Sequence, residues 1–377
     1  MKYVLIHRCA GGYVTALSEN GRLVEYISDP FDGSVVGNIY KGIIKKINTG
    51  FIFVDIGLAQ QVFIDTADGR ERHLFAGDKL SVKQNGELIV QILKDSLGTK
   101  GPVATTNVAY SGRYIVLSKA VGDDTTTVSR KIDTAEGQRL LDTVKPMIPS
   151  GFSAIIRTAA VGRRSDELQT EIAHLASQFD KHSEWTYAKA PSVLRQEPSI
   201  LRTLRDIVTD DVDAVWTDCH ELAMQNPNLQ INYYDSTQHH DQPLFEHYFL
   251  QTQIAKLRDK RVWLNSGAFI VIEQVEACVV IDVNTGKASG KQSDATKLKV
   301  NMEAAKEIAS QIRLRNLSGI IIIDFIAMKS QADIAALTDF LRQEFRKDRI
   351  PTVAVGMTQL GLMEVTRKRM RNSVNAH

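Results

Sequence analysis

Two strongly apolar segments in the last third of the chain each end in an aspartate. Residues 279–281 (VVI) precede Asp282, and residues 319–323 (GIIII) precede Asp324. Between them, residues 294–314 carry apolar side chains at the spacing of one helical face. This order predicts two neighbouring parallel strands, over 277–283 and 319–325, joined by a crossover helix. Continuous apolar runs are typical of strands that are covered on both faces.

The two aspartates are expected to share one cleft. Ligand sites of open α/β sheets gather at the carboxyl edge of the strands, where Asp282 and Asp324 would both lie. Two adjacent carboxylates repel each other unless a cation binds them, and ligation by oxygen alone favours magnesium or manganese over zinc. A single aspartate after a strand is more often a helix cap or a turn residue. Asn284 has two readings as well, since it either orients Asp282 or simply occupies a turn before Gly286.

Other catalytic motifs have little support. Residues 286–291 are rich in glycine and lysine, but Lys291 is followed by Gln292, so the P-loop pattern G-x-x-x-x-G-K-[ST] does not occur. A G-x-S-x-G elbow is absent from the sequence. Nucleotide hydrolysis and serine-hydrolase chemistry are therefore weak alternatives.

Length and cysteine usage bound the class of protein. A chain of 377 residues exceeds a single hydrophobic core, so several domains are expected. The three cysteines, Cys9, Cys219 and Cys278, are far apart and form no C-x-x-C pair, which favours a reducing compartment over disulfides or zinc. No apolar run reaches the length of a signal segment or a membrane span, so we expect a cytoplasmic protein.

The distribution of charge is more informative than the net charge of +2. Three basic clusters stand apart in the sequence, which suggests a polyanionic partner. They comprise Lys41, Lys45 and Lys46; Arg157, Arg163 and Arg164; and Arg367, Lys368, Arg369 and Arg371.

The first half of the chain has the texture of a small barrel. Alternating apolar residues and glycines predict strands over 36–44, 50–57 and 61–64, with two more over 77–83 and 87–92. Five strands is the count of an OB-fold. Beyond a glycine-rich joint at 98–102, strands are expected over 113–118 and 153–158 and helices over 167–188 and 199–208.

Four sequence blocks, in order, closely resemble the catalytic region of the ribonuclease E/G family. They are IDVNTGK (281–287), NMEAA (301–305), IRLRNLSGIIIIDF (312–325) and LGLMEVTRKR (360–369). Upstream, GNIYKG (37–42) with FVDIG (53–57) resembles the OB-fold of that family, and IRTAAVG (156–162) resembles its 5′-end sensor. The resemblance spans nearly the whole chain and is weakest over 209–241.

The resemblance implies a multi-domain α+β fold. An RNase-H-like subdomain would combine residues 1–34 with 194–265, and an OB-fold RNA-binding domain would cover 35–108. Residues 109–193 would form the 5′-sensor region and residues 266–377 a DNase-I-like α/β catalytic subdomain.

The resemblance also implies a function. The chain would be a magnesium-dependent endoribonuclease that hydrolyses single-stranded RNA to 5′-phosphate and 3′-hydroxyl ends, in the processing and decay of RNA, with manganese as an alternative metal. Asp282 and Asp324 would hold the metal, and Asn284 would position Asp282. The remaining roles fall on two sets of residues: Phe53, Phe63 and Lys100 for single-stranded RNA, and Arg157 and Thr158, with the backbones of Gly112 and Val116, for a 5′-monophosphate.

The sequence departs from the family pattern at three points. Ala327 stands where members often have another aspartate, and Gln359 where some have an arginine near the sensor. No cysteine follows Cys278, so neither structural zinc nor a zinc-bridged dimer is expected, although a homodimer of another kind stays open.

The main rival to the enzyme is a catalytically weak RNA-binding protein on the same fold. For single residues the plainer alternatives are a core role for Phe53 and Phe63, and a polar loop rather than a metal site for the histidines His239, His240 and His247.

Overall fold

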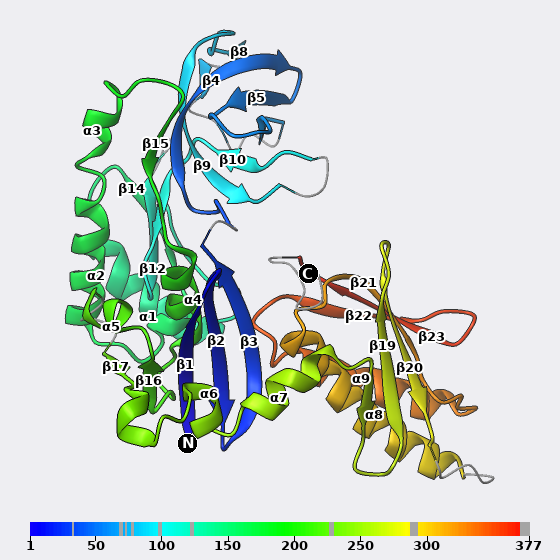
Figure 1. Cartoon of the computed structure of the whole chain (residues 1–377). Coiled ribbons are helices and arrows are strands. Elements are labelled where there is room, and N and C mark those ends of the chain that lie inside the picture. The colour runs from blue at the N-terminus through cyan, green and yellow to red at the C-terminus, as the bar shows by residue number, and fades with distance from the viewer. Residues whose placement is uncertain are drawn as a thin grey trace. The chain divides into compact units, whose positions relative to one another are not determined.

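The chain folds into a mixed α+β structure with several separate sheets (Figure 1). A computed structural model describes residues 1–31, 34–67, 71, 74–76, 79–96, 100–120, 124–225, 230–286 and 293–369. The chain divides into two compact units, Met1–Asp29 with Asp210–His377, and Pro30–Thr209. No helix in the described ranges combines the length and the apolar character that crossing a bilayer requires.

A closed, OB-like barrel forms the first part of the second unit. Its strands are β4 (Ile39–Asn48), β5 (Phe51–Asp55), β6 (Val62–Asp65), β10 (Val103–Thr105) and β9 (Glu87–Lys94), and β4 pairs with β9 to close the ring. Alternate side chains such as Ile52, Val54 and Ile64 fill the interior, as the two-residue period of a strand requires. β15 (Ser192–Arg195) extends the same sheet by pairing with β4.

One barrel strand differs from the sequence prediction. Lys79–Leu80 (β8) pairs with Phe75–Ala76 (β7) in a separate two-stranded sheet, and β10 supplies the fifth barrel strand instead of 77–83. β10 has only three residues and lies parallel to β6, so its pairing is long-range and leaves no local alternation to detect. Gly101 allows this approach, because a Cβ there would lie 2.1 Å from the carbonyl oxygen of Gln61.

A four-stranded sheet with two helices completes the second unit. The strand order is β11 (Ala109–Ser111), β12 (Ile115–Lys119), β14 (Phe152–Ile156) and β13 (Thr126–Val128). Helices α1 (Thr134–Val144) and α2 (Ser165–Ser177) bury Leu140, Leu168 and Ile172 in its core. The shorter elements are η2 (Lys145–Met147), η3 (Thr158–Ala160), α3 (His182–Trp185) and α4 (Ser199–Ile207).

The helix expected over 167–188 is wrong in its length, because it breaks after Ser177. There the chain turns inward to bury Phe179, whose ring lies 4.6 Å from Tyr110 and 4.7 Å from His182. His182 also stacks on Trp185 at 4.1 Å and forms a 2.8 Å hydrogen bond with the Tyr110 hydroxyl. Aromatic packing therefore overrides helical continuity at this point.

His182 predicts a loss of stability in mild acid. Burial, with help from Lys119 and Arg195, lowers the pKa of His182 from its ordinary 6.5 to about 4. As the pH falls from 6.5 to 4, the His182 ring binds a proton in the unfolded chain but stays neutral in the folded chain. The free energy of unfolding therefore decreases over this pH range. Urea denaturation of His182→Gln at pH 7.5 and pH 5 should show a smaller fall than the parent chain. The same substitution at His174, an exposed ring on α2, should leave the parent profile unchanged; a His182→Gln profile equal to the parent would contradict the prediction.

The first unit contains a sheet assembled from distant segments. β1 (Lys2–Cys9), β2 (Gly12–Glu19) and β3 (Arg22–Pro30) are consecutive hairpins, and β1 also lies parallel to β16 (Ala214–Thr217), which pairs with β17 (Ile231–Tyr233). The remaining short helices are α5 (His220–Gln225), η5 (Ser236–His239), α6 (Leu244–His247), α7 (Gln251–Ala255) and η6 (Lys256–Arg258). The rings of His239 and His247 lie 4.6 Å apart, and both pack beside the Tyr234 ring.

The second sheet of this unit carries the two aspartates. Its order is β18 (Arg261–Trp263), β19 (Phe269–Gln274), β20 (Val279–Asn284), β21 (Gly319–Asp324), β23 (Leu362–Arg367) and β22 (Thr352–Met357). Helix α8 (Asp294–Leu314) begins at Ser293, whose side chain accepts from the Thr296 amide, and its bounds are those predicted from the sequence. Together with α9 (Gln331–Phe345), α8 covers one face, where Ile281, Ile308 and Ile323 are buried.

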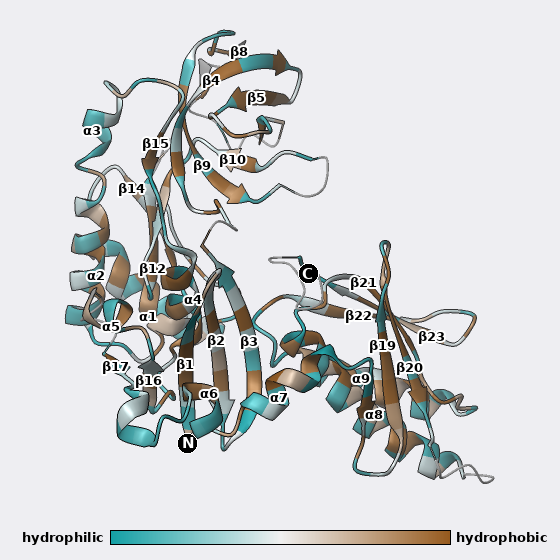
Figure 2. Cartoon of the chain, viewed as in Figure 1, coloured by the Kyte–Doolittle hydropathy of each residue, from teal (hydrophilic) through white to brown (hydrophobic). Residues whose placement is uncertain are grey.

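The sequence predicted that both faces of this sheet are covered, but side chains on the opposite face are exposed. Val280 and Ile320, on the other side of β20 and β21, are 39% and 55% exposed. Figure 2 shows how hydrophobic these strands are along their length. The apolar runs therefore reflect the high strand propensity of valine and isoleucine rather than cover on both faces.

Candidate active site

Asp282 and Asp324 lie directly opposite each other at the carboxyl ends of β20 and β21. The two strands are parallel, and the register pairs Ile281 with Ile323 and Asp282 with Asp324. Paired residues of neighbouring strands project to the same face, and the strands are roughly 4.8 Å apart. The isoleucines point into the α8 core and the aspartates are exposed. The strand, helix, strand order thus brings together two acids that are 42 positions apart in the sequence (324 − 282).

The electrostatics of this pair favour a bound cation. Within the described ranges, neither carboxylate pairs with a lysine or arginine; Asp282 instead accepts a 2.6 Å hydrogen bond from the Asn284 Nδ2. That bond engages the Oδ2 of Asp282, and no described residue forms a hydrogen bond with its Oδ1. Like charges on neighbouring strands are costly unless a cation neutralises them, and two carboxylates are donors that magnesium accepts. The donor set therefore fits a magnesium ion.

The described residues supply few further ligands. They contain no group of three or more histidine, cysteine or acidic side chains that could hold a metal. A pair of carboxylates suits magnesium, because this ion keeps several waters and commonly binds one or two carboxylates plus phosphate oxygens. Residues 287–292, which include most of the glycine- and lysine-rich stretch, lie outside the described ranges.

A buried asparagine holds the chain that leaves Asp324. Asn301, fully buried on α8, donates from Nδ2 to the Ile326 carbonyl at 2.9 Å and accepts from the Ile326 amide at 3.0 Å. One residue further, the Ala327 carbonyl accepts from the Lys297 Nζ at 3.2 Å. No role was predicted for Asn301, although a polar residue on the buried face of a helix indicates a buried hydrogen-bond partner. Ala327 itself has an exposed side chain without a carboxylate.

Three phenylalanines form an exposed cluster on the barrel wall. Phe53 and Phe63 are register partners on β5 and β6, with ring centroids 6.0 Å apart. Phe51 lies 5.5 Å from Phe53 and 5.6 Å from Phe63, and all three rings are partly exposed. Lys100 is exposed and lies close in the chain to Pro102, whose carbonyl accepts from the Phe63 amide. Phe51 was not among the residues predicted to bind RNA, although its position two residues before Phe53 places it on the same face of the strand.

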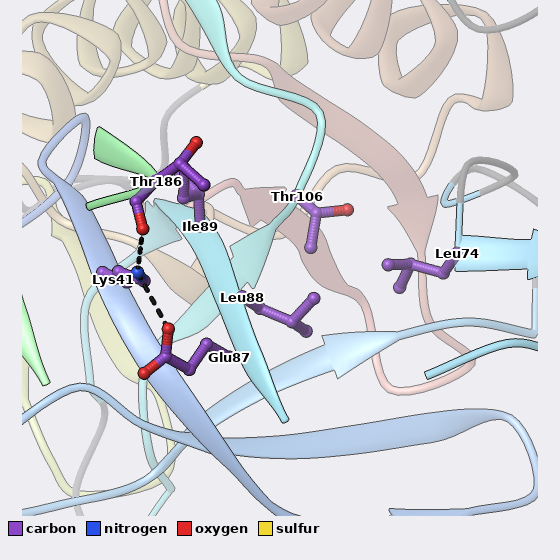
Figure 3. A pocket seen from close by; sticks show the side chains of 7 residues that line it. All are labelled: Lys41, Leu74, Glu87, Leu88, Ile89, Thr106 and Thr186. Carbon is purple, nitrogen blue, oxygen red and sulfur yellow. Dashed lines mark hydrogen bonds and ion pairs between the residues drawn. The ribbon is translucent and has the colours of Figure 1, made fainter. Parts of the chain in front are cut away.

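Lys41 is not available to a polyanion, contrary to the reading of the first basic cluster. Its ammonium group lines a pocket with Glu87 and Thr186 (Figure 3) and is buried. It lies 2.8 Å from the Glu87 carboxylate and donates to the carbonyls of Thr186 at 2.7 Å and Ala188 at 2.8 Å. These contacts use all three donors of the lysine, so the group joins the barrel to the segment after α3.

Arg157 and Thr158 sit beside the loop that precedes β12. The Arg157 Nη1 donates to the Gly112 carbonyl at 2.7 Å, and its Nη2 pairs with Asp206 at 2.6 Å. Thr158 is exposed at the start of η3. The Gly112 amide donates to the Ile115 carbonyl within the loop, and Val116 lies on β12 opposite Ile155. The structure thus brings Arg157, which precedes Thr158 in the chain, into hydrogen-bond contact with Gly112, whereas Val116 lies further along, on β12.

Comparison with known proteins matches this sequence to one family. Residues 109–370 match the model of the ribonuclease E/G family. The chain is 35% identical to ribonuclease G of Escherichia coli (strain K12) over 365 residues, which cover 90% of this chain and 74% of that protein. It is 34% identical to ribonuclease G of Haemophilus influenzae, in a match that covers 95% of this chain and 78% of that protein. It is 31% identical to ribonuclease E of E. coli (strain K12), in a match that covers 95% of this chain and 36% of that protein. The chain therefore belongs to the ribonuclease E/G family.

Proposed function

We propose that this chain is an endoribonuclease that cleaves single-stranded RNA during RNA processing and decay. One observation carries the proposal: two exposed carboxylates, Asp282 and Asp324, face the same side of adjacent parallel strands in a member of a ribonuclease family. Relatives named ribonuclease G and ribonuclease E support the activity. The β18–β23 sheet with α8 and α9 would be the DNase-I-like catalytic subdomain, and the β1–β3 sheet with β16 and β17 the RNase-H-like one.

In this proposal each residue at the acid pair has a distinct task. Asp282 and Asp324 bind magnesium, and Asn284 holds one oxygen of Asp282 so that the other stays directed at the ion. Magnesium, when bound, supplies the charge that stabilises the phosphodiester transition state and lowers the pKa of the attacking water. Cleavage of the bond from phosphorus to the 3′ oxygen would leave a 5′-phosphate and a 3′-hydroxyl end. Asn301 keeps the backbone after Asp324 fixed during this step.

The barrel would hold the RNA strand. Phe51, Phe53 and Phe63 present partly exposed ring faces and edges on which unpaired bases stack, and Lys100 adds positive charge nearby. Arg157 and Thr158, with the backbones of Gly112 and Val116, would bind a 5′-monophosphate. We assign the chain to the cytoplasm, because its substrate would be RNA and its three cysteines are free thiols, and a homodimer without bridging zinc is compatible with this assignment.

Removing one ring of the barrel cluster should weaken RNA binding. Phe53→Ala is expected to cost about 1 to 3 kcal/mol of binding free energy, or roughly 5- to 150-fold in Kd, for an unstructured oligonucleotide. Fluorescence anisotropy without divalent metal measures this separately from cleavage. Tyr187→Ala, which removes a 91% exposed ring elsewhere in the same unit, should leave Kd unchanged. Equal Kd values for Phe53→Ala and the parent chain would remove the cluster from the binding surface.

The proposal as a whole is tested with a 5′-monophosphorylated, AU-rich oligonucleotide. With magnesium, the parent chain should cut it internally, and mass spectrometry of the products should find 5′-phosphate and 3′-hydroxyl ends. Tight binding without products would favour the rival, an RNA-binding protein on the same fold. Phosphate release from ATP or GTP, which we do not expect, would point instead to nucleotide hydrolysis.

A further inference from the structure

A single carboxylate organises the loop of residues 112–115. Glu171, on α2, accepts hydrogen bonds from the backbone amides of Arg113, Tyr114 and Ile115, each at 2.8 Å. The contact is close enough that a Cβ on Gly112 would lie 2.3 Å from the Glu171 Oε1. Three amides converging on one carboxylate make charge-assisted bonds, which are stronger than bonds between neutral groups.

This loop in turn places Arg157. The Gly112 carbonyl accepts from the Arg157 Nη1, and the Tyr114 carbonyl accepts from the Arg157 backbone amide at 2.8 Å. On its other side the guanidinium meets Asp206, on α4, at 2.6 Å. Helix α4 is itself tied to the loop region, because the Arg205 Nη1 donates to the Ser111 carbonyl at 2.7 Å. Arg157 is thus hydrogen-bonded through both of its terminal nitrogens, Nη1 and Nη2.

The two contacts of Arg157 leave further N–H donors of its guanidinium for a ligand. A guanidinium has five N–H donors. Among the described residues, two of these donors serve the Gly112 carbonyl and Asp206, which leaves three for a ligand, and the side chain is 28% exposed. A fork that is already held in one orientation loses less side-chain entropy when it binds a phosphate.

We infer that Glu171 and Asp206 are positioning residues for 5′-end recognition, since they fix from two sides the orientation of Arg157. The inference rests on the proposed function, because it assumes that Arg157 meets the terminal phosphate of RNA. Glu171 acts through the loop and the Gly112 carbonyl, whereas Asp206 acts directly on Nη2. Neither residue has to touch the RNA.

The test compares two oligonucleotides of one sequence, one with a 5′-monophosphate and one with a 5′-hydroxyl. Fluorescence anisotropy in EDTA gives the ratio of their Kd values, a preference that is independent of catalysis. A general loss of stability would lower both affinities together and leave this ratio unchanged. Glu171→Gln and Asp206→Asn should each bring the ratio to within about twofold of one, because the first weakens the charge-assisted bonds that hold the loop around Arg157 and the second weakens the direct bond to its Nη2. Asp166→Asn, the same charge change on the exposed side of α2, should keep the preference of the parent chain.

Three outcomes would overturn the inference. The first is a parent chain without any preference for the 5′-monophosphate, and the second is a Glu171→Gln protein that keeps the parent ratio. The third is an increased preference in Asp206→Asn, which would mean that Asp206 competes with the phosphate for Arg157. Asp206 is a half-exposed residue, so its variant reports even if Glu171→Gln fails to fold. Cleavage of the 5′-hydroxyl oligonucleotide with magnesium tests the proposed function separately, because it needs no terminal phosphate.

Discussion

Replacing Asp282 with asparagine should lower the rate of magnesium-dependent RNA cleavage by about a thousandfold or more. The variant keeps the shape of the side chain but removes one of the two charges that are proposed to hold the metal. A bound metal ion stabilises the negative charge of a transition state by several kcal/mol, and each 1.4 kcal/mol corresponds to about a tenfold change in rate. Asp324→Asn should have an effect of similar size, since the two residues are register partners.

The controls separate catalysis from folding. Asp282 is exposed, so its substitution should leave thermal unfolding and RNA affinity in EDTA close to those of the parent chain. Asp339→Asn makes the same chemical change at an exposed position of α9, 69% accessible, and should not alter the rate. Asn284→Ala should lose roughly 10- to 100-fold, as expected for a residue that orients a ligand. Wild-type cleavage rates in Asp282→Asn, measured by single-turnover assays, would contradict this assignment.

Replacing Arg367 with alanine should cost about 3 to 5 kcal/mol of unfolding free energy, because it strands a buried carboxylate. The Arg367 Nε lies 2.8 Å from Asp348, and both side chains are about 95% buried. The Nη1 also donates to the Asn316 side chain at 2.8 Å and to the Leu317 carbonyl at 3.0 Å. This network ties β23 to the turn after α8.

Urea denaturation followed by far-UV circular dichroism measures the loss. Lys368→Ala, the adjacent and exposed cation, should change stability by less than about 0.5 kcal/mol. If Arg367→Ala were as mild as Lys368→Ala, the buried pair would be unimportant. Arg367 therefore belongs to the core, which corrects its place in the last basic cluster; Arg371 of that cluster lies outside the described ranges.

The acid pair was predictable because its determinants are local. Helical spacing over 294–314 and two apolar runs ending in aspartate predict a crossover between neighbouring parallel strands, and the structure adds the register that pairs the two aspartates. The fate of individual cations was not predictable in the same way. Lys41 and Arg367 look like surface charges in sequence, and only tertiary partners, Glu87 and Asp348, reveal that they are buried.

Contacts between distant segments explain the remaining gaps. The three-residue strand β10 has no periodicity of its own, so its place in the barrel depends on β6 and β9. Glu171 looks like one of several helix-surface acids, yet its partners lie 56 to 58 positions earlier in the chain. Phe51 was a gap of a different kind, since its spacing from Phe53 was visible in the sequence.

The central claim is that Asp282 and Asp324 share one divalent ion. Manganese binding, followed by the loss of the free-ion signal in electron paramagnetic resonance, tests it without RNA and without turnover. We predict one site in the parent chain and an affinity at least about tenfold weaker in each of Asp282→Asn and Asp324→Asn, because each variant removes a charged ligand. Unchanged manganese affinity in either variant would contradict the claim.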